Sequence, residues 1–380
     1  MPYLEIFLLL LAVWLFGRFF KRIGWPAIFG EILAGILMGP VLLGVVHDSE
    51  YIKILAELGI FFLMFHAGLE TSPSDLFKAS KYSLLVALGG VILPFASGFL
   101  ISKAFDFNSI ESLFIGMGLS ISSVAVSARI FKDCNILNSK AAHITLGAAI
   151  IDDILGLILF SIVLNIAENG SISINEISFL TARIIIFFAL TLFIGQKFFT
   201  QLHKILYEGN KGFTFTIILA LFFGILAEFM GIHVIIGAFM AGLFIKEEII
   251  EKKLFSKIED RIYGLSYSFL GPIFFASLAF HLDFKAILSL PLFTFSVVII
   301  AVASKVLGAG LMTYLMGMKK IEALTVGLAM NSRGAVEMII AVIGLEKNII
   351  SKEVFSILII VAFVTTIISI ITLKPVAKRL

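Results

Sequence analysis

The chain has 380 residues, of which 60% are hydrophobic and 14% are charged, and its formal net charge is +3. Its mean hydropathy of +1.09 lies far outside the range of soluble globular domains. Composition therefore excludes a soluble enzyme or nucleic-acid-binding domain and predicts a protein that crosses the membrane many times. The only cysteine, Cys134, cannot form an internal disulfide, and the sequence contains no cysteine and histidine cluster with the spacing of a metal site.

Apolar runs long enough to cross a bilayer recur along the whole chain. A spanning helix needs about 17–25 mostly apolar residues, and the sequence contains thirteen such runs. The predicted spans are residues 3–20, 25–46, 51–69, 82–103, 110–131, 140–166, 177–200, 212–230, 232–246, 263–281, 286–316, 321–345 and 353–373. Only a bend at Gly231, Ile232 and His233 separates the eighth span from the short ninth. The short loops leave no room for a soluble domain, so residues 1–380 form one transmembrane domain.

The distribution of lysine and arginine predicts the orientation. Of the 29 basic residues, twenty-one lie in one alternating set of loops and flanks, and only six lie in the opposite set. Because cytoplasmic loops carry the excess of positive charge, we expect the N-terminus outside and the C-terminus in the cytoplasm. The alternation stays in phase only if the chain has thirteen spans.

Three short matches indicate an internal repeat. Residues 34–37 match 241–244, residues 60–62 match 273–275, and residues 118–119 match 327–328, at nearly one offset. This offset carries each span onto the one seven further along, and because seven is odd the two copies are inverted. We expect inverted repeats at about 1–166 and 212–373, joined by a linker helix at about 177–200. Such repeats are typical of secondary transporters, whose sites lie near the membrane midplane.

Two adjacent carboxylates, Asp152 and Asp153, lie inside an otherwise apolar helix predicted at about 141–166. One aspartate at the centre of a membrane helix costs roughly 2.5–3.5 kcal/mol on insertion. Two aspartates without a counter-charge would cost more, so we expect them to have a function. Successive helical residues point about 100° apart, so one carboxylate can meet a buried counter-charge while the other faces a cavity. The alternative is that they are solvated at a helix end, although apolar residues surround them on both sides.

The fifth and twelfth spans, which the repeat relates, contain unusual polar residues. The fifth is rich in small and hydroxylated residues, and the twelfth contains the run Asn331-Ser332-Arg333-Gly334. Such residues form poor continuous helix, because serine and asparagine bond to the local backbone. We expect both helices to break midway and to cross each other. The freed carbonyl groups and the oxygens of four side chains are candidate ligands of an alkali cation: Ser122, Ser123, Asn331 and Ser332. For the fifth span, the alternative is simple packing of small residues.

Three further charged residues lie at membrane depth. Lys305 is the sole lysine deep within a long apolar span, and its obvious counter-ion is one of the two aspartates. Snorkelling of Lys305 to the interface is the alternative, although apolar residues flank it on either side. Arg333 and Glu337 are four residues apart, a spacing that allows pairing along one helix face. They either form that structural pair or take part directly in transport.

These features together resemble the monovalent cation/proton antiporter superfamily over essentially the whole chain. The Gly-Leu-Glu run at 68–70 and the Phe-Phe and His-Leu-Asp pattern at 274–283 are similar to its Kef-like and plant cation/proton exchanger branch. The resemblance implies that Asp153 is the main carboxylate for cation and proton and that Asp152 pairs with Lys305. It also implies that an Asp-Asp pair goes with electrogenic exchange. One departure is that two residues separate Arg333-Gly334 from Glu337, whereas many relatives place an acid directly after Arg-Gly.

The resemblance also implies the setting of the protein. We expect a homodimer in the lipid bilayer of a prokaryotic inner membrane, with Na⁺ or K⁺ and H⁺ as substrates, no cofactor, and a contribution to pH homeostasis.

The predicted mechanism is competition between a monovalent cation and a proton for one carboxylate site that opens alternately to each side. The alternative is a sodium-coupled organic solute symporter, since inverted repeats and crossed helices also occur there. Such a symporter would not need a buried lysine beside a carboxylate pair. An intramembrane aspartyl protease would place its two carboxylates on different helices, and a passive channel would need an open polar path. The sequence therefore predicts an antiporter rather than an enzyme.

Overall fold

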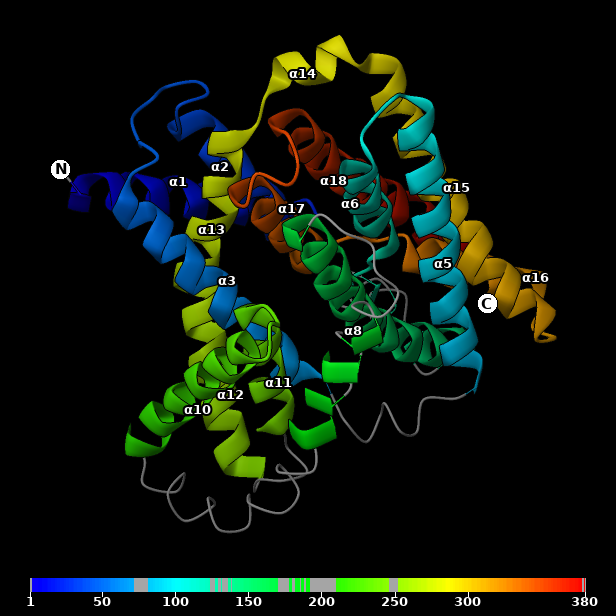
Figure 1. The fold of residues 1–380 in the computed structure, drawn as a ribbon, viewed down its shortest axis with the longest axis horizontal. Coiled ribbons are helices and arrows are strands. Elements are labelled where there is room, and N and C mark those ends of the chain that lie inside the picture. Colours follow the sequence, from blue (N-terminus) through cyan, green and yellow to red (C-terminus); the bar gives the residue numbers. More distant parts are fainter. Residues whose placement is uncertain are drawn as a thin grey trace. The chain divides into compact units, whose positions relative to one another are not determined.

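The computed structural model describes residues 2–71, 81–123, 127–128, 131, 136–137, 139–169, 178–179, 182–184, 186–187, 189–191, 210–245, 252–377 and 379. Every regular element within these ranges is a helix, and none is a strand (Figure 1). The helices are α1 (Pro2–Arg22), α2 (Ala27–Met38), α3 (Glu50–Glu70), α5 (Lys81–Ala104), α6 (Ser109–Ser120), α8 (Lys140–Asn169), α10 (Asn210–Phe229), α11 (Val234–Phe244), α12 (Lys252–Leu265), η1 (Ser266–Leu270), α13 (Gly271–Leu278), η2 (Ala279–His281), α14 (Phe284–Ser289), α15 (Pro291–Leu315), α16 (Lys320–Met330), α17 (Ala335–Glu346) and α18 (Lys352–Ala377). The predicted all-α class is confirmed.

Most helices fall on predicted membrane spans, but α12 lies mainly in the predicted loop between residues 246 and 263. Within the described residues, eight helical stretches, two of which join several of these elements, are long and apolar enough to cross a membrane. Shorter apolar helices such as α2, α6 and α11 occupy other predicted spans. The predicted linker helix at 177–200 lies largely outside the described residues. The bend expected between the eighth and ninth spans is confirmed, because α10 ends at Phe229 and α11 begins at Val234. Gly231 has φ 72° in this bend, a left-handed conformation that glycine adopts without steric cost.

The chain divides into two compact units, and each is built from both halves of the sequence. The first unit comprises Met1–Pro73 and Ile172–Phe280, and the second comprises Ser74–Ser171 and His281–Leu380. Repeat partners share a unit: α2 and α11 belong to the first, and α6 and α16 belong to the second. The boundaries of the repeats themselves, at about 1–166 and 212–373, stay a prediction.

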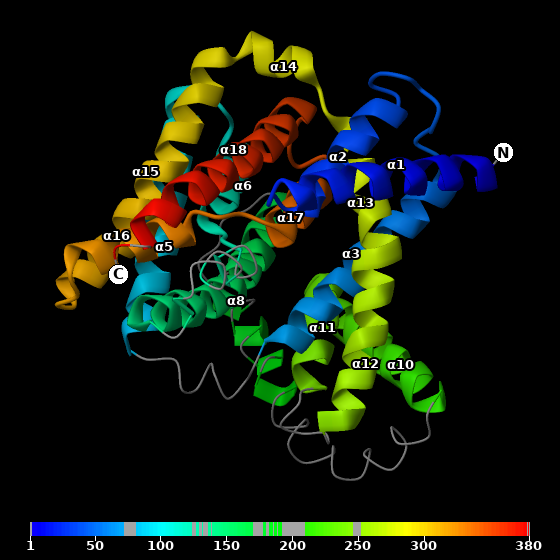
Figure 2. The same ribbon diagram turned by 180° about the vertical axis from the view of Figure 1, so that it is seen from behind.

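In the first unit, α3 packs against α11 and α13 with its backbone in close contact (Figure 2). A Cβ atom added at Gly68 would lie 1.9 Å from the carbonyl oxygen of Phe239, and one added at Gly242 would lie 2.1 Å from that of Phe65. Only glycine lets α3 and α11 approach so closely, and close glycine contacts are common between membrane helices.

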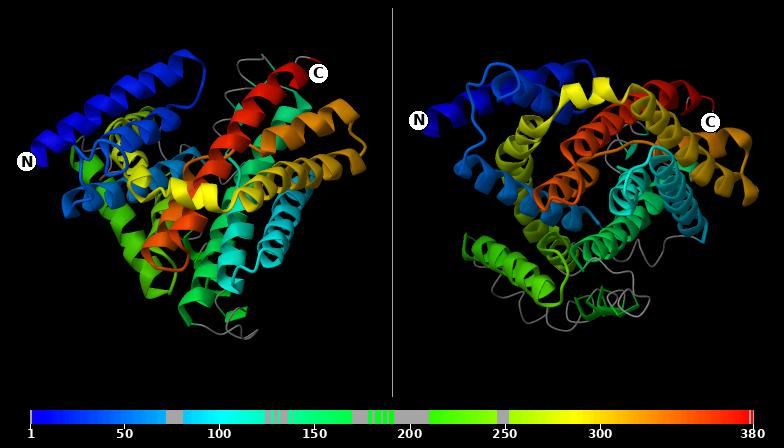
Figure 3. Two further views of the ribbon diagram at one scale, coloured as in Figure 1. Left: turned by 90° about the horizontal axis from the view of Figure 1, so that it is seen from above. Right: turned by 45° about the horizontal axis from the view of Figure 1, so that its top comes forward.

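In the second unit, α5 and α15 run side by side, as two views show (Figures 1 and 3). They also touch through glycine, since a Cβ atom at Gly308 would lie 2.2 Å from the carbonyl oxygen of Gly89. A buried apolar cluster that includes Val86, Ala148 and Val326 joins α5, α8 and α16 around this contact. The packing places the middle of α8 beside the interrupted helices.

The glycine contacts make a prediction about stability. We expect Gly68→Ala to lower the free energy of unfolding by about 1–3 kcal/mol or more, because the added methyl group must push two backbones apart. Thermal unfolding of the purified protein in detergent measures this.

The matched control is Gly264→Ala, because a Cβ atom at Gly264 meets nothing within 4 Å. Alanine is favoured over glycine inside a helix by about 1 kcal/mol, so this control should keep or raise the unfolding temperature. Equal unfolding temperatures for Gly68→Ala and the unchanged protein would contradict the prediction.

Candidate cation and proton site

Two helices of the second unit are interrupted, as predicted. The first half of the twelfth span, α16, ends at Met330, and the second half, α17, begins only at Ala335. The fifth span is helical up to Ser120, and residues 121–123 are not helical. Much of the chain that follows, from residue 124 to 138, lies outside the described residues. The break at 331–334 and the end of α6 at the corresponding depth are thus both confirmed.

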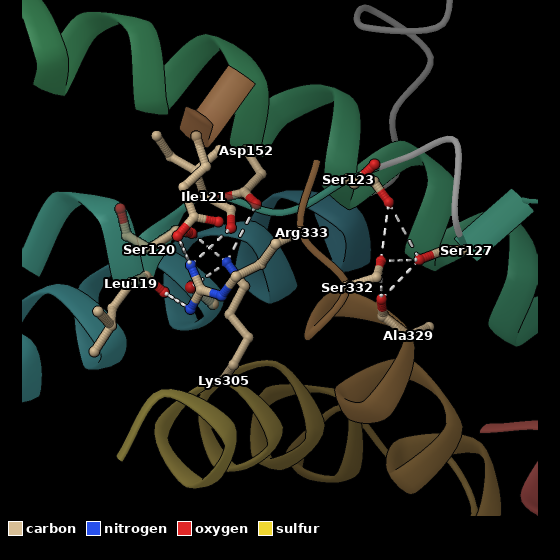
Figure 4. Close-up of polar contacts among 12 residues, drawn as sticks. Leu119, Ser120, Ile121, Ser123, Ser127, Asp152, Lys305, Ala329, Ser332 and Arg333 are labelled. Atoms are coloured by element: carbon tan, nitrogen blue, oxygen red, sulfur yellow. Dashed lines mark hydrogen bonds and ion pairs between the residues drawn. The ribbon is translucent and has the colours of Figure 1, made fainter. Parts of the chain in front are cut away.

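The two interruptions hydrogen-bond to each other. The backbone N–H of Ser123 donates to the carbonyl oxygen of Ser332 over 2.7 Å, and Ser332 Oγ lies 3.0 Å from the carbonyl oxygen of Ser123. Ser127 Oγ lies 2.8 Å from Ser332 Oγ (Figure 4). Non-helical backbone at membrane depth is tolerated only where protein or water satisfies its polar groups. Here each interruption supplies the hydrogen-bond partners that the other lacks.

A third helix, α18, also supports the break at 331–334. The backbone N–H of Arg333 donates to Thr366 Oγ1 over 3.0 Å, and Asn331 Nδ2 donates to the carbonyl oxygen of Thr365 over 3.3 Å. Sequence reasoning missed this support. The signal for it is the group of hydroxyl residues Thr365, Thr366 and Ser369 inside an otherwise apolar span.

The structure brings Lys305 of α15 against Asp152 of α8. Both side chains are fully buried, and Lys305 Nζ lies 3.2 Å from Asp152 Oδ2. The ammonium group also donates to the carbonyl oxygen of Gly90 over 2.8 Å and to that of Ser120, the last residue of α6. Its three protons therefore have three acceptors from three different helices. Neither carbonyl partner could be foreseen from the sequence.

Arg333 and Glu337 also meet, and both are buried. Arg333 Nη1 lies 3.1 Å from Glu337 Oε1. The guanidinium group donates in addition to the carbonyl oxygens of Gly118 and Leu119, over 2.8 Å for the latter (Figure 4). These carbonyls belong to the last turn of α6, where the helix dipole favours a positive charge. The pair that the i,i+4 spacing allows is therefore present, and it also caps the interrupted helix α6.

Among the predicted ligand residues, some oxygens are used by the fold and others are not. The Ser332 hydroxyl contacts the break around Ser123, as described above. In the described part of the chain, Asn331 Oδ1 and Glu337 Oε2 are buried without a hydrogen-bond partner. Leaving a buried polar atom unpaired costs free energy, so these oxygens are the best placed to accept a cation or a proton. Asp153 differs from Asp152 in being only half-buried.

A bundle of apolar helices in which two interrupted helices meet beside buried charges is the architecture of a secondary transporter. The family model for the transmembrane sodium/hydrogen exchanger matches residues 6–379. The chain therefore belongs to the sodium/hydrogen exchanger family, which consists of cation/proton antiporters and not of enzymes.

Two relatives and one solved structure illustrate the similarity. The chain is 34% identical to the probable Na(+)/H(+) antiporter GerT of Bacillus cereus over 94% of each chain. It is 31% identical to the Na(+)/H(+)-K(+) antiporter GerN of the same organism, over 97% of this chain and 94% of GerN. The structure of the sodium proton antiporter MjNhaP1 from Methanocaldococcus jannaschii matches with a TM-score of 0.77 at 17% identity, covering 98% of this chain and 96% of that one.

These comparisons confirm the predicted resemblance, and the MjNhaP1 structure confirms the fold. The chain is a multi-pass membrane protein of an ion-transporting antiporter family. The alternative prediction, a sodium-coupled organic solute symporter, has no support, because the relatives that match nearly the full length are named antiporters.

The buried Asp152 and Lys305 contact makes a prediction about stability. Removing one partner of a buried ion pair typically costs about 3–5 kcal/mol, because it strands the other charge. We therefore expect Asp152→Asn to lower the thermal unfolding temperature in detergent markedly. The double variant Asp152→Asn with Lys305→Gln should recover part of the loss.

An exposed ion pair between α8 and the end of α17 provides the control. Glu168 near the end of α8 lies 2.5 Å from Lys347, and both side chains are partly exposed. Such surface pairs contribute about 0–1 kcal/mol, so Glu168→Gln should leave the unfolding temperature nearly unchanged. If Asp152→Asn behaved like this control, the buried pair would not be stabilising the unit.

Proposed function

We propose that the protein exchanges a monovalent cation, Na⁺ or K⁺, for H⁺ by competition of the two ions for the Asp152-Asp153 pair. The observation that carries the proposal is the buried contact of Asp152 with Lys305 at the junction of two interrupted helices. A charge pair at this depth is costly to insert into the membrane, so its presence indicates a function. The names of GerT and GerN, which include Na⁺ and, for GerN, K⁺, support this substrate class.

The two aspartates have different roles in this mechanism. Asp152 is held by the Lys305 ammonium and fixes the register of α8 against α15. Asp153 is the next residue on the helix, so it points about 100° away; it is half-buried and is the carboxylate at which the monovalent cation binds. When a proton occupies Asp153, the cation loses its main ligand, and a bound cation excludes the proton.

Neutral oxygens complete the cation site. Ser122 interacts with Asp152 through both its side chain and its backbone, so its buried hydroxyl oxygen lies beside the carboxylate pair. Hydroxyl, carbonyl and carboxylate oxygens are the hard ligands that alkali cations prefer. Ser123 and Ser332 contribute mainly by shaping the interruptions, since their backbone and side-chain groups bond across the break. Asn331 bonds to α18 through its amide nitrogen, which leaves its amide oxygen for the cation.

We further propose the setting that the sequence predicts. The protein lies in the plasma membrane of a prokaryote as a homodimer, with its N-terminus outside and its C-terminus in the cytoplasm, and exchange across that membrane contributes to pH homeostasis. The excess of lysine and arginine in alternate loops supports the orientation.

The role of Asp153 can be tested by transport. Asp153→Asn should reduce cation-driven proton flux in proteoliposomes to the background of empty vesicles, because the amide keeps the shape but binds neither the proton nor the full cation charge. A pH-sensitive dye inside the vesicles reports the flux as Na⁺ or K⁺ is added. Glu168→Gln, an exposed change on the same helix, should keep the original rate. Exchange at an unchanged rate in Asp153→Asn would remove this residue from the central role.

The stoichiometry is a separate question, and we propose electrogenic exchange of two protons for one cation. Each cycle then moves one net charge, which couples transport to the membrane potential by roughly 2.3 kcal/mol per 100 mV. The second proton comes from Asp152 or Lys305, because a cation near the pair weakens their contact. An imposed potential should therefore change both the rate and the endpoint of Na⁺-driven proton flux.

Exchange that does not depend on the membrane potential would contradict this stoichiometry. If the rate and endpoint stay the same when an ionophore collapses the potential, exchange is one for one. Lys305 would then be a permanent structural charge, and the second proton would have no carrier.

A further inference from the structure

The two neutral acceptors of the Lys305 ammonium group are the backbone carbonyl oxygens of Gly90 in α5 and Ser120 in α6. Inside an α-helix, each carbonyl oxygen accepts the N–H of the residue four positions further along. Carbonyl groups in the middle of a helix are therefore normally occupied by their own helix. The Ser120 carbonyl is available because α6 ends at this residue. Gly90 needs a different explanation, because α5 continues without a break from Lys81 to Ala104.

The explanation lies four residues further along α5, at Pro94. Proline has no backbone N–H, and its ring clashes with the carbonyl group four residues before it. Pro94 is buried inside α5, so the usual partner of the Gly90 carbonyl is missing. That carbonyl instead accepts Lys305 Nζ over 2.8 Å. Proline is tolerated within a membrane helix when a neighbouring helix satisfies the freed carbonyl group, and here α15 does so with a charged group.

The backbone of α5 also lies directly against the ammonium group. A Cβ atom added at Gly90 would lie 3.8 Å from Lys305 Nζ, so no side chain of this residue separates the carbonyl from the charge. One residue earlier, a Cβ atom at Gly89 would lie 2.5 Å from the carbonyl oxygen of Gly308, which shows how closely α15 approaches. Pro94 frees the acceptor, and the missing side chains at residues 89 and 90 let α15 reach it.

The freed carbonyl affects what Lys305 can do when a cation binds. In the structure the ammonium group bonds to Asp152 over 3.2 Å and to the two carbonyl oxygens (Figure 4). A cation beside the carboxylate takes over part of the negative charge that holds the ammonium group. Because a buried charge without partners is costly, the two carbonyl oxygens determine how readily the ammonium group gives up Asp152. With one carbonyl fewer, the ammonium group and the cation compete more strongly for the same carboxylate.

We propose that Pro94 is a positioning residue of the cation and proton site, which keeps the Gly90 carbonyl free to hold the Lys305 ammonium group while the cation binds. This inference rests on the proposed function. Pro94 acts through the backbone of α5 and not by contact with either transported ion. Alanine at this position supplies an N–H that bonds to the Gly90 carbonyl and competes with Lys305. The cation then binds more weakly, and the turnover of the filled site changes less.

The transport test compares two changes at residue 94 that differ only in the N–H group. Pro94→Ala introduces the N–H. Lactic acid, the hydroxy-acid analogue of alanine, is placed at the same position of the full chain by nonsense suppression, and its ester oxygen leaves the N–H absent. In proteoliposomes, Pro94→Ala should raise the KM for the driving cation, Na⁺ or K⁺, several-fold with little change in kcat, the pattern of weakened binding. The ester form should recover a KM close to the original.

The comparison separates the N–H from the shape of the helix. Both forms lack the proline ring, so any effect of straightening α5 is common to them. If the alanine and ester forms have the same KM, the proposal is overturned.

The matched control is Pro375→Ala. Pro375 also lies inside a helix of the second unit, α18, but its side chain is exposed. The acceptors of Lys305 described above lie on α5, α6 and α8, so this variant should keep the original KM. A KM raised equally by both alanine variants would indicate a general effect of losing a proline and would overturn the proposal.

A double-mutant cycle tests the contact without transport. Alanine is more favourable than proline inside a helix, so in the Lys305→Gln background Pro94→Ala should raise the thermal unfolding temperature in detergent. With Lys305 present, the same change weakens a hydrogen bond to a buried charge, so the gain should be smaller or reversed. If Lys305→Gln fails to fold, the double variant Asp152→Asn with Lys305→Gln, which strands no charge, takes its place as the background. Additive effects would overturn the proposal.

Failure of the proposed function looks different from failure of this inference. If no form of the protein shows cation-driven proton flux, the proposed function is wrong, and the double-mutant cycle alone decides whether Pro94 positions Lys305. If the flux is normal and the alanine and ester forms share one KM, the proposed function stands and the role of Pro94 is overturned.

Discussion

The buried ammonium group of Lys305 is the constraint on which the second unit depends. It lies in an apolar bundle where an unpaired charge is costly, and it is satisfied by Gly90 of α5, Ser120 of α6 and Asp152 of α8. Displacing any of these helices from α15 would leave a charge or a carbonyl group without a partner. The contact therefore explains why α6 can end at Ser120 inside the unit, because the carbonyl oxygen of Ser120 accepts a hydrogen bond from the Lys305 ammonium group.

Arg333, which lies in the break at 331–334, meets the same requirement at the end of α6. Where a membrane helix breaks, the freed carbonyl and N–H groups need partners, because no water is available in the hydrocarbon core. The guanidinium group binds carbonyls in the last turn of α6, and Glu337 balances its charge. The two broken ends then bond to each other through Ser123 and Ser332. The side chains of Lys305 and Arg333 thus hold the two interruptions together within the second unit.

Much of the candidate site could be predicted because its residues are unusual in an apolar membrane helix. A lysine, an arginine and paired acids at membrane depth stand out by composition alone, and Asn331-Ser332-Arg333-Gly334 stands out as poor helix. The partners that satisfy these groups do not stand out. Nothing in the sequence shows which side chain the carbonyl of Gly90 binds, and the importance of Thr366 depends on what packs against it.

The sequence by itself determined which segments form the apolar helices, where two of them are interrupted, and the family. These follow from hydropathy and from backbone chemistry over a few neighbouring residues, which are local properties. Only the tertiary structure decided how the helices are shared between two units, with segments from both halves of the chain in each. It alone also decided that the carbonyl oxygens of Gly90 and Ser120 join Asp152 around the Lys305 ammonium group. Such contacts join residues more than a hundred positions apart, and they depend on which helix faces pack together, which no local pattern specifies.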